Sequence, residues 1–267
     1  MKHHADRNAL LINLGGGVIT DLGGFAASTY KRGIKFINVP TTLLAMVDAA
    51  IGGKTGIDFG GGKNQIGTFA EAEAVLIKPD FLMTLPEREL LSGMAEMLKY
   101  GFIADDNLLN VSVENYKDYI LRAGEIKRDI VAKDPTEKGL RKILNFGHTL
   151  GHAIESHSLT TEHPLLHGEA VALGMRAALW LSVKQCGLDE KVLDDYEKHL
   201  HMLLAETKLG LTEADVEPVL QWLVHDKKNR GEKPQFVLLK AVGKPVWDVE
   251  VEPELVKASL LYIINKV

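Results

Sequence analysis

The stretch Leu10-Leu-Ile-Asn-Leu-Gly-Gly-Gly-Val-Ile-Thr-Asp21 decides how the first part of the chain folds. The apolar run Leu10–Leu14 predicts a short strand, and a helical pattern that continues to Ala26 begins directly after the glycines at 15–17. Glycine lets the backbone approach a phosphate closely, and free N–H groups at the start of a helix point toward an anion. The spacing is not G-x-G-x-x-G, so a tight turn without a ligand fits it equally well.

Neighbouring segments extend this strand and helix into a sheet. Lys35–Val39 and Glu73–Ile77 predict two further strands. Between them, Thr41 and Thr42 can cap a helix that runs through Ala50. Strands separated by crossovers are typical of a parallel sheet with covered faces.

The pattern becomes helical from about residue 80. We expect helices over residues 86–100, 105–122, 136–156, 167–186, 189–207 and 212–225, and late strands over 235–241 and 246–251. No linker rich in Pro or Ser separates the two parts. We therefore predict an α/β plus all-α protein, with a partial Rossmann-like parallel-sheet domain over 1–79 and a helical domain over 80–267.

Composition excludes several classes of protein. The chain has 267 residues, a net charge of -5 and 46% hydrophobic residues, which is typical of a globular protein with a sizeable core. The acidic balance argues against a nucleic-acid partner, and the sequence has no apolar run long enough to span a membrane. A single cysteine excludes an internal disulfide and fits a reducing compartment, so we expect a cytoplasmic protein.

Two further glycine-rich turns carry lysines, Gly52-Gly-Lys-Thr55 and Gly60-Gly-Gly-Lys-Asn64. The first does not complete the P-loop pattern, because Asp48 occupies the position of its first glycine. Each lysine alone fits a solvated loop. Three glycine-rich turns within about 50 residues together favour a site for an anion.

The segment from Glu137 to His152 concentrates polar residues. Glu137, Arg141, Asn145, His148 and His152 are spaced so that they fall within roughly 80° of one face of the expected helix. A solvated face usually carries Lys and Glu, so two histidines and an asparagine favour a functional site. The glycines at 147 and 151 suggest close approach of another backbone.

The two histidines of this segment, His148 and His152, are four residues apart and could both bind one metal ion. A further ligand could come from His167 or from Glu96, which has Lys99 on the same helix face. Two imidazoles and a carboxylate leave open positions on zinc, which is a catalytic arrangement.

The motifs named so far occur together with others in a fixed order. They are Gly-Gly-Gly-Val-Ile-Thr-Asp (15–21), Arg-Gly (32–33), Val-Pro-Thr-Thr-Leu-Leu-Ala-Met-Val-Asp (39–48), Ile-Gly-Gly-Lys-Thr (51–55), Gly-Lys-Asn (62–64), Gly-Met-Ala-Glu (93–96) with Lys99, Asn-Phe-Gly-His-Thr-Leu-Gly-His (145–152) and His-Gly-Glu-Ala-Val (167–171). On these motifs the sequence resembles the 3-dehydroquinate synthase family, from residue 10 to the lysine pair near 228.

The resemblance implies that the first domain binds NAD and that the helical domain binds substrate and a zinc ion, for which cobalt can substitute. The substrate would be a phosphorylated sugar acid, 3-deoxy-D-arabino-heptulosonate 7-phosphate. The products would be 3-dehydroquinate and phosphate, in the shikimate pathway of aromatic amino acid biosynthesis. A homodimer is implied because Arg32 would reach the substrate phosphate in the neighbouring subunit.

The resemblance also assigns residues to the site. Zinc would be bound by Glu96, His148 and His167, while His152 would lie beside them and move protons. The residues that bind NAD would be Gly15, Gly16, Gly17, Val18, Asp21, Thr41, Thr42, Leu44, Lys63, Phe81, Leu82, Met83 and Thr84. The substrate would contact Asp48, Lys54, Asn64, Lys99, Lys127, Glu137, Arg141, Asn145 and one of Lys227 and Lys228.

Family members carry a segment before the glycine turn that supplies opening strands and groups that hold the NAD adenosine. Nine residues precede Leu10 here, so we expect weakened or absent NAD binding. Two other functions stay open. Another sugar-phosphate cyclase or a metal- and NAD-dependent polyol dehydrogenase shares the architecture, although the combination of Lys127, Arg141 and Asn145 disfavours a dehydrogenase. A remnant without enzymatic activity is the third hypothesis.

Overall fold

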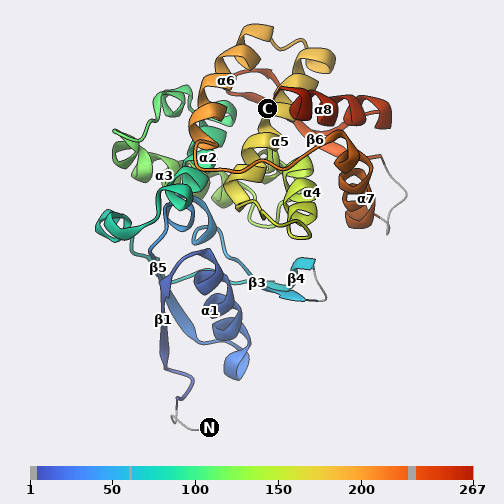
Figure 1. The fold of residues 1–267 in the computed structure, drawn as a ribbon. Helices are drawn as coiled ribbons and strands as arrows, with labels where there is room; N and C mark the ends of the chain where they lie inside the picture. Colours follow the sequence, from blue (N-terminus) through green and yellow to red (C-terminus); the bar gives the residue numbers. More distant parts are fainter. Residues whose placement is uncertain (1–4, 60–61, 228–232, 267) are drawn as a thin grey trace.

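The computed structural model describes residues 5–59, 62–227 and 233–266. Its first part is a three-stranded parallel sheet in the order β1-β2-β5, formed by Leu10–Gly15, Lys35–Pro40 and Ala74–Val75. The register pairs Leu10 with Lys35 and Gly15 with Pro40. Helix α1 (Gly17–Thr29) makes the crossover from β1 to β2 (Figure 1). The predicted strand–glycine turn–helix unit and the parallel sheet are therefore confirmed.

Only one face of this sheet is covered by a helix among the described residues. Asn13 and the other side chains on the α1 side are shielded, whereas Leu10, Ile12 and Leu14 point the opposite way and are 50%, 60% and 58% exposed. Parallel sheets are normally covered on both faces. This protein consequently carries an exposed apolar sheet face, with β1 as its edge strand.

The glycine-rich segment between β2 and β5 is an antiparallel hairpin and not a pair of loops. Strands β3 (Lys54–Phe59) and β4 (Gly62–Phe69) pair with Gly56 opposite Gly67. A Cβ on Gly67 would lie 2.4 Å from the carbonyl oxygen of Thr55, so this close pairing requires glycine. The expectation of lysine-bearing turns at 52–64 missed these strands.

The second part of the chain packs around one buried helix, α5 (His167–Cys186). Its residues 168–179 are all buried, and α5 contacts α2 (Glu87–Ile103), α4 (His148–Ser158), α6 (Glu190–Leu203) and α8 (Pro253–Asn265) (Figure 1). The remaining elements are α3 (Tyr116–Lys133), α7 (Val216–Lys227) and the antiparallel pair β6 (Gln235–Ala241) and β7 (Lys244–Glu250). The helix over 167–186 was predicted with these bounds, whereas α8 was not predicted.

Two predicted helices are wrong in extent. In place of a helix over 105–122, a short 3-10 turn spans Asp106–Asn110 and α3 begins only at Tyr116. The Asn115 side chain accepts a hydrogen bond from the backbone N–H of Ser112 at 2.7 Å and donates to the carbonyl of Asn110 at 3.0 Å. Such side-chain bonds to the backbone compete with the helix.

The predicted helix over 136–156 is broken as well. A 3-10 turn spans Leu140–Asn145, and α4 starts at His148. Glu137 and Gly147 have positive φ angles of 58° and 79°, which no continuous helix accommodates. The suggested close approach at Gly147 is confirmed, because a Cβ there would lie 2.9 Å from the backbone nitrogen of Met175 on α5.

Among the described residues, no helix combines the length and the apolar character that crossing a bilayer requires.

Candidate functional site

Three helices bring a carboxylate and two imidazoles to one point. Glu96 lies in the middle of α2, while His148 and His167 are the first residues of α4 and α5. Oxygen Oε1 of Glu96 lies 3.3 Å from Nε2 of His148 and 3.2 Å from Nε2 of His167. The predicted set of metal ligands therefore converges, although Glu96 is 52 residues before His148 in the sequence and His167 is 19 residues after it.

The fourth member of this group is His152, one turn along α4 from His148. The ligand nitrogens of His148, His152 and His167 all lie within 4.8 Å of one another, and His152 is the exposed ring of the three. Desolvation, together with the imidazoles of His148 and His167, lowers the pKa of His152 to about 3. Its ring is therefore neutral at pH 7 in the metal-free protein, with a nitrogen lone pair that can accept a hydrogen bond.

Charges around Glu96 keep this carboxylate ionised although it is fully buried. Burial would raise the pKa of Glu96, but the Lys99 ammonium and the His148 imidazole hold it well below its usual range. Burial would likewise lower the pKa of His167, and hydrogen bonds to Glu155 and Glu96 raise it to about 9. The Glu96 carboxylate is thus surrounded by the Lys99 ammonium and by the imidazoles of His148 and His167.

The start of α5 is packed tightly onto α2, which fixes His167 relative to Glu96. The backbone N–H of Gly168 donates to Ser92 Oγ at 3.0 Å, and a Cβ on Gly168 would lie 1.9 Å from the Ser92 carbonyl oxygen. Arg88 donates to both carboxylate oxygens of the buried Glu169, at 2.6 and 2.7 Å. The sequence reasoning did not single out this Arg88–Glu169 pair, which joins the two helices.

A second cluster lies next to Glu96 and is centred on Asp48. The Lys127 ammonium lies 2.9 Å from Asp48 Oδ2, Lys99 lies 3.4 Å from Asp48 Oδ1, and Lys99 also contacts Glu96. Burial would raise the pKa of Asp48, but Lys127 and Lys99 hold it well below its usual range. Tyr100, which was not predicted, donates from its hydroxyl to Asp48 Oδ1 at 2.6 Å. Its position one turn after Glu96 was the available signal.

A third cluster gathers the polar residues of the broken helix. Glu137 forms an ion pair with Lys54 and accepts a hydrogen bond from Asn145 Nδ2 at 2.6 Å. Arg141 donates to the carbonyl oxygens of Gly52 and Pro135, at 2.8 and 2.7 Å. Its remaining nitrogen, Nε, is buried and has no hydrogen-bond partner among the described residues. An unpaired buried donor of this kind is suited to an anionic ligand.

The second and third clusters meet at Gly52. A Cβ on Gly52 would lie 3.0 Å from Arg141 Nη2 and 3.6 Å from Lys127 Cε. The structure therefore brings together the charged residues predicted at 48, 54, 99, 127, 137 and 141 and the amide of Asn145, although a broken segment and not one helix face carries the last three. Hydrogen bonds from the backbone to Asp134 hold that segment in its turns.

The donor atoms around Glu96 fit a zinc ion. A tetrahedral ion bound at 2.0–2.1 Å holds its donor atoms about 3.3–3.4 Å apart. The distances of 3.2 and 3.3 Å from Glu96 Oε1 to the two imidazole nitrogens match this spacing. Two nitrogen donors and one carboxylate oxygen also leave a coordination position open, as catalytic zinc sites do.

Family models settle the relationship of the chain. Residues 1–92 match the model of the amino-terminal part of 3-dehydroquinate synthase, and residues 93–229 match that of its carboxy-terminal part. The chain belongs to the 3-dehydroquinate synthase family. The 3-dehydroquinate synthase of Parabacteroides distasonis is 45% identical over 266 residues, which are 96% of this chain and 74% of that protein. That of a Synechocystis species is 45% identical over 272 residues, 96% of this chain and 73% of that protein.

Solved structures place this member of the 3-dehydroquinate synthase family among sugar-phosphate cyclases. A 2-epi-5-epi-valiolone synthase from Streptomyces hygroscopicus, with NAD+ and Zn2+ bound, is similar with a TM-score of 0.86 and 29% identity, over 98% of this chain and 76% of that one. A 2-deoxy-scyllo-inosose synthase complexed with carbaglucose-6-phosphate, NAD+ and Co2+ has a TM-score of 0.83 and 28% identity, over 96% of this chain and 74% of that one. A probable glycerol dehydrogenase from Sinorhizobium meliloti shares the fold alone. It is 15% identical, with a TM-score of 0.60 over 99% of this chain and 78% of that one.

The residues that the 3-dehydroquinate synthase resemblance assigns to NAD lie partly around the glycine turn. Gly16 caps the start of α1, and Cβ atoms on Gly16 and Gly17 would lie 3.0 Å from Thr42 Cγ2 and 3.2 Å from Ala49 Cβ. The Thr42 hydroxyl accepts from the N–H of Ala45 at 3.2 Å, so the predicted cap is confirmed, and the helix that follows is a wide π-helical turn over Ala45–Ala49. Gly15, Val18, Thr41 and Leu44 belong to the same junction.

A cavity of about 240 Å³ is lined by residues of α1, of the π-helical turn and of α3. Its charged lining comes from Asp21, Lys54, Glu71 and Arg128, and Gly52 and Gly53 also line it. Burial, together with the carboxylates of Asp48 and Asp58, outweighs Lys127 and raises the pKa of Asp21 to about 7.

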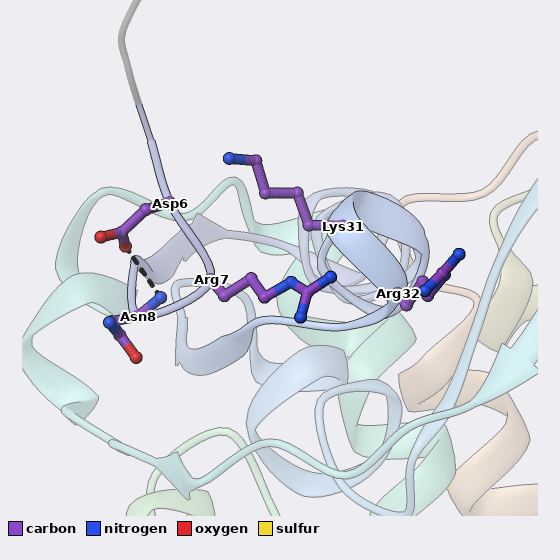
Figure 2. Close-up of a pocket in the computed structure, with 5 residues that line it drawn as sticks. All are labelled: Asp6, Arg7, Asn8, Lys31 and Arg32. Carbon is purple, nitrogen blue, oxygen red and sulfur yellow. Dashed lines mark hydrogen bonds between the residues drawn. The ribbon is translucent and has the colours of Figure 1, made fainter.

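The other assigned residues lie apart or outside the described side chains. Phe81, Leu82, Met83 and Thr84 belong to a 3-10 turn that precedes α2. Arg32 lies at the opposite end of α1 from Gly16, about 20 Å away for a helix of 13 residues. Figure 2 shows it beside Arg7 and Lys31 in a surface hollow. The side chains of Lys63, Asn64 and Lys227, and all of Lys228, lie outside the described residues.

Proposed function

We propose that this protein acts as a 3-dehydroquinate synthase, which converts 3-deoxy-D-arabino-heptulosonate 7-phosphate to 3-dehydroquinate and phosphate with NAD and zinc or cobalt. The observation that carries the proposal is the 3.2–3.3 Å convergence of Glu96, His148 and His167 beside the lysines that flank Asp48. A relative of that name is 45% identical over 96% of the chain, which supports the choice of substrate.

Glu96, His148 and His167 would hold the metal ion, and the start of α1 would hold NAD. When bound, the ion polarises the hydroxyl that is oxidised, and NAD takes up and returns a hydride. Lys99 compensates the charges of Glu96 and Asp48, so both stay ionised as acceptors. His152, whose ring lies next to those of His148 and His167, would move protons beside them.

Basic groups in the second and third clusters would bind the carboxylate and the phosphate of the substrate. Lys54 is 53% exposed at its side chain and held by Glu137, so it can reach an entering anion. Arg141 is fixed by two backbone carbonyls with its Nε unpaired among the described residues, which orients one charge-assisted donor. Lys127 is buried, and its ammonium is positioned by the Asp48 carboxylate and carbonyl oxygen at 2.9 and 2.6 Å.

The remaining assignments of the resemblance complete this proposal. The protein would be a cytoplasmic homodimer in which Arg32, at the far end of α1, contacts the substrate phosphate of the neighbouring subunit. Residues 1–79 would form the NAD-binding domain and residues 80–267 the zinc- and substrate-binding domain. The backbone N–H groups that α1 leaves free after Gly16 are the groups suited to the NAD pyrophosphate.

Phosphate release tests the function. We expect release from the heptulosonate phosphate in the presence of NAD and zinc, and little from sugar phosphates that lack a carboxylate. His148→Ala should lower the rate by more than about 100-fold, beyond the range for loss of an outer metal partner. His201→Ala, an exposed histidine on α6, is the matched control. Release only from sugar phosphates without a carboxylate would identify a different cyclase. Equal rates for the unaltered chain and His148→Ala would exclude the proposed site.

A further inference from the structure

The structure assigns a role to Glu155, a residue outside the set that the family resemblance names. We propose that Glu155 is a positioning residue that fixes the His167 ring for metal binding. The inference rests on the proposed metal site. The Glu155 side chain is 3% exposed, and its Oε2 lies 3.3 Å from Nδ1 of His167. This buried carboxylate therefore sits behind the ring, on the side away from Glu96.

The two nitrogens of the His167 ring have separate partners. Nε2 lies 3.2 Å from Glu96 Oε1, and Nδ1 faces Glu155. An ionised carboxylate accepts hydrogen bonds only, so when Nε2 binds the metal ion and the ring keeps a single hydrogen, that hydrogen is on Nδ1 with Glu155 as its acceptor. In that form the Nε2 lone pair would face the point where Glu96 and His148 converge. Glu155 thereby selects the ring form that can bind a metal ion.

The other imidazole of the set repeats this arrangement. Nδ1 of His148 lies 3.0 Å from the carbonyl oxygen of Phe146, which can only accept a hydrogen bond. Both rings thus donate through Nδ1 and present Nε2 toward Glu96. The two acceptors differ. The His148 ring faces the neutral carbonyl group of Phe146, whereas the His167 ring faces the negatively charged carboxylate of Glu155. A carboxylate behind a metal-binding histidine raises the basicity of the ligand as well as orienting it.

The sequence places Glu155 where α4 can deliver it. It follows His148 by seven residues and His152 by three, so all three side chains lie on one face of α4. That face packs on α5, whose first residue is His167. One helix therefore supplies an imidazole and, two turns later, the carboxylate that orients an imidazole of the neighbouring helix.

Zinc titration of four proteins tests this role: the unaltered chain, Glu155→Gln, Glu155→Ala and Glu162→Gln. Gln keeps the size and an acceptor oxygen but loses the charge, and Glu162 is an exposed glutamate of the segment before His167. We expect Glu155→Gln to weaken zinc binding by about 10- to 100-fold and Glu155→Ala by at least as much, with Glu162→Gln unchanged. The visible absorption of the cobalt-loaded protein should shift in the two Glu155 variants.

A purely structural role for Glu155 predicts other results. It would lower the melting temperature of the metal-free protein and leave both the zinc affinity and the cobalt spectrum of the folded fraction unchanged, which would overturn the inference. Because Glu155→Gln preserves the side-chain volume, it keeps the test valid if Glu155→Ala does not fold. If the unaltered chain binds zinc no better than His148→Ala, the proposed function fails together with this inference. If the unaltered chain binds zinc more tightly than His148→Ala, but Glu155→Gln binds zinc as tightly as the unaltered chain, this inference fails and the proposed function stands.

Discussion

Substituting Gly168 by alanine should separate the metal-binding helices without removing any ligand. A Cβ at this position would lie 1.9 Å from the carbonyl oxygen of Ser92, whereas real contacts of this kind stay beyond 3.0 Å. The start of α5 must then retreat from α2 by at least 1.1 Å, because the obstacle is backbone and not a flexible side chain. His167 immediately precedes Gly168 and would move with it.

The size of this displacement sets the expected loss. Metal sites tolerate deviations of about 0.2 Å in the distances to their ligands, so the retreat is about five times the tolerance. We expect the zinc dissociation constant of Gly168→Ala to rise by at least about 100-fold. Overpacking at the helix contact should lower the free energy of unfolding by about 1–3 kcal/mol.

Competitive titration against a zinc chelator measures the affinity, and calorimetric unfolding of the metal-free protein measures the stability. Gly210→Ala is the matched control, because nothing lies within 4 Å of a Cβ added there. The reasoning is refuted if Gly168→Ala binds zinc within threefold of the unaltered chain. A loss of stability equal to that of Gly210→Ala would also contradict the predicted clash.

Two further predictions concern the first part of the chain. Because the folded protein raises the pKa of Asp21 to about 7, ionisation of this group costs stability as the pH rises from about 4 to 7. The free energy of unfolding of Asp21→Asn, relative to that of the unaltered chain, should therefore rise by about 2 kcal/mol between pH 4 and pH 8. This value is discounted because the group is partly exposed. Equal pH dependence of the unfolding free energy in the two proteins would contradict the prediction. Ile12→Lys should reduce light scattering and dye binding at the exposed apolar sheet face, whereas the same change at Leu121, exposed on α3, should not.

Local patterns in the sequence predicted the elements whose signals are local. The strand, glycine turn and helix from Leu10 onward follow from the spacing of apolar residues and from the glycines between them. The bounds of α5 follow from the same kind of local pattern. The hairpin over 54–69 was missed because its glycines indicate turns, while their real role is the close pairing of two backbones. That role depends on a partner strand that the local sequence does not reveal.

Many of the residues gathered at the candidate site were singled out from the sequence, but their geometry was not. Glu137, Arg141 and Asn145 do lie in one cluster, yet the positive φ angles at Glu137 and Gly147 break the helix that was expected to align them. Glu155 and Tyr100 were missed because each acts through contacts with another element. Spacing along one helix can identify residues that share a face, but the partner of that face is set by tertiary packing.

The placement of His148 and His167 as the opening residues of α4 and α5 has an electrostatic consequence. Aligned peptide dipoles leave roughly half a positive elementary charge at the beginning of each helix. The positive ends of α4 and α5 therefore lie beside the point where the proposed divalent cation would bind, so the buried Glu96 carboxylate has to offset this helix potential as well as the charge of the ion. Because the main chain generates this potential, no exchange of side chains at these positions would abolish it.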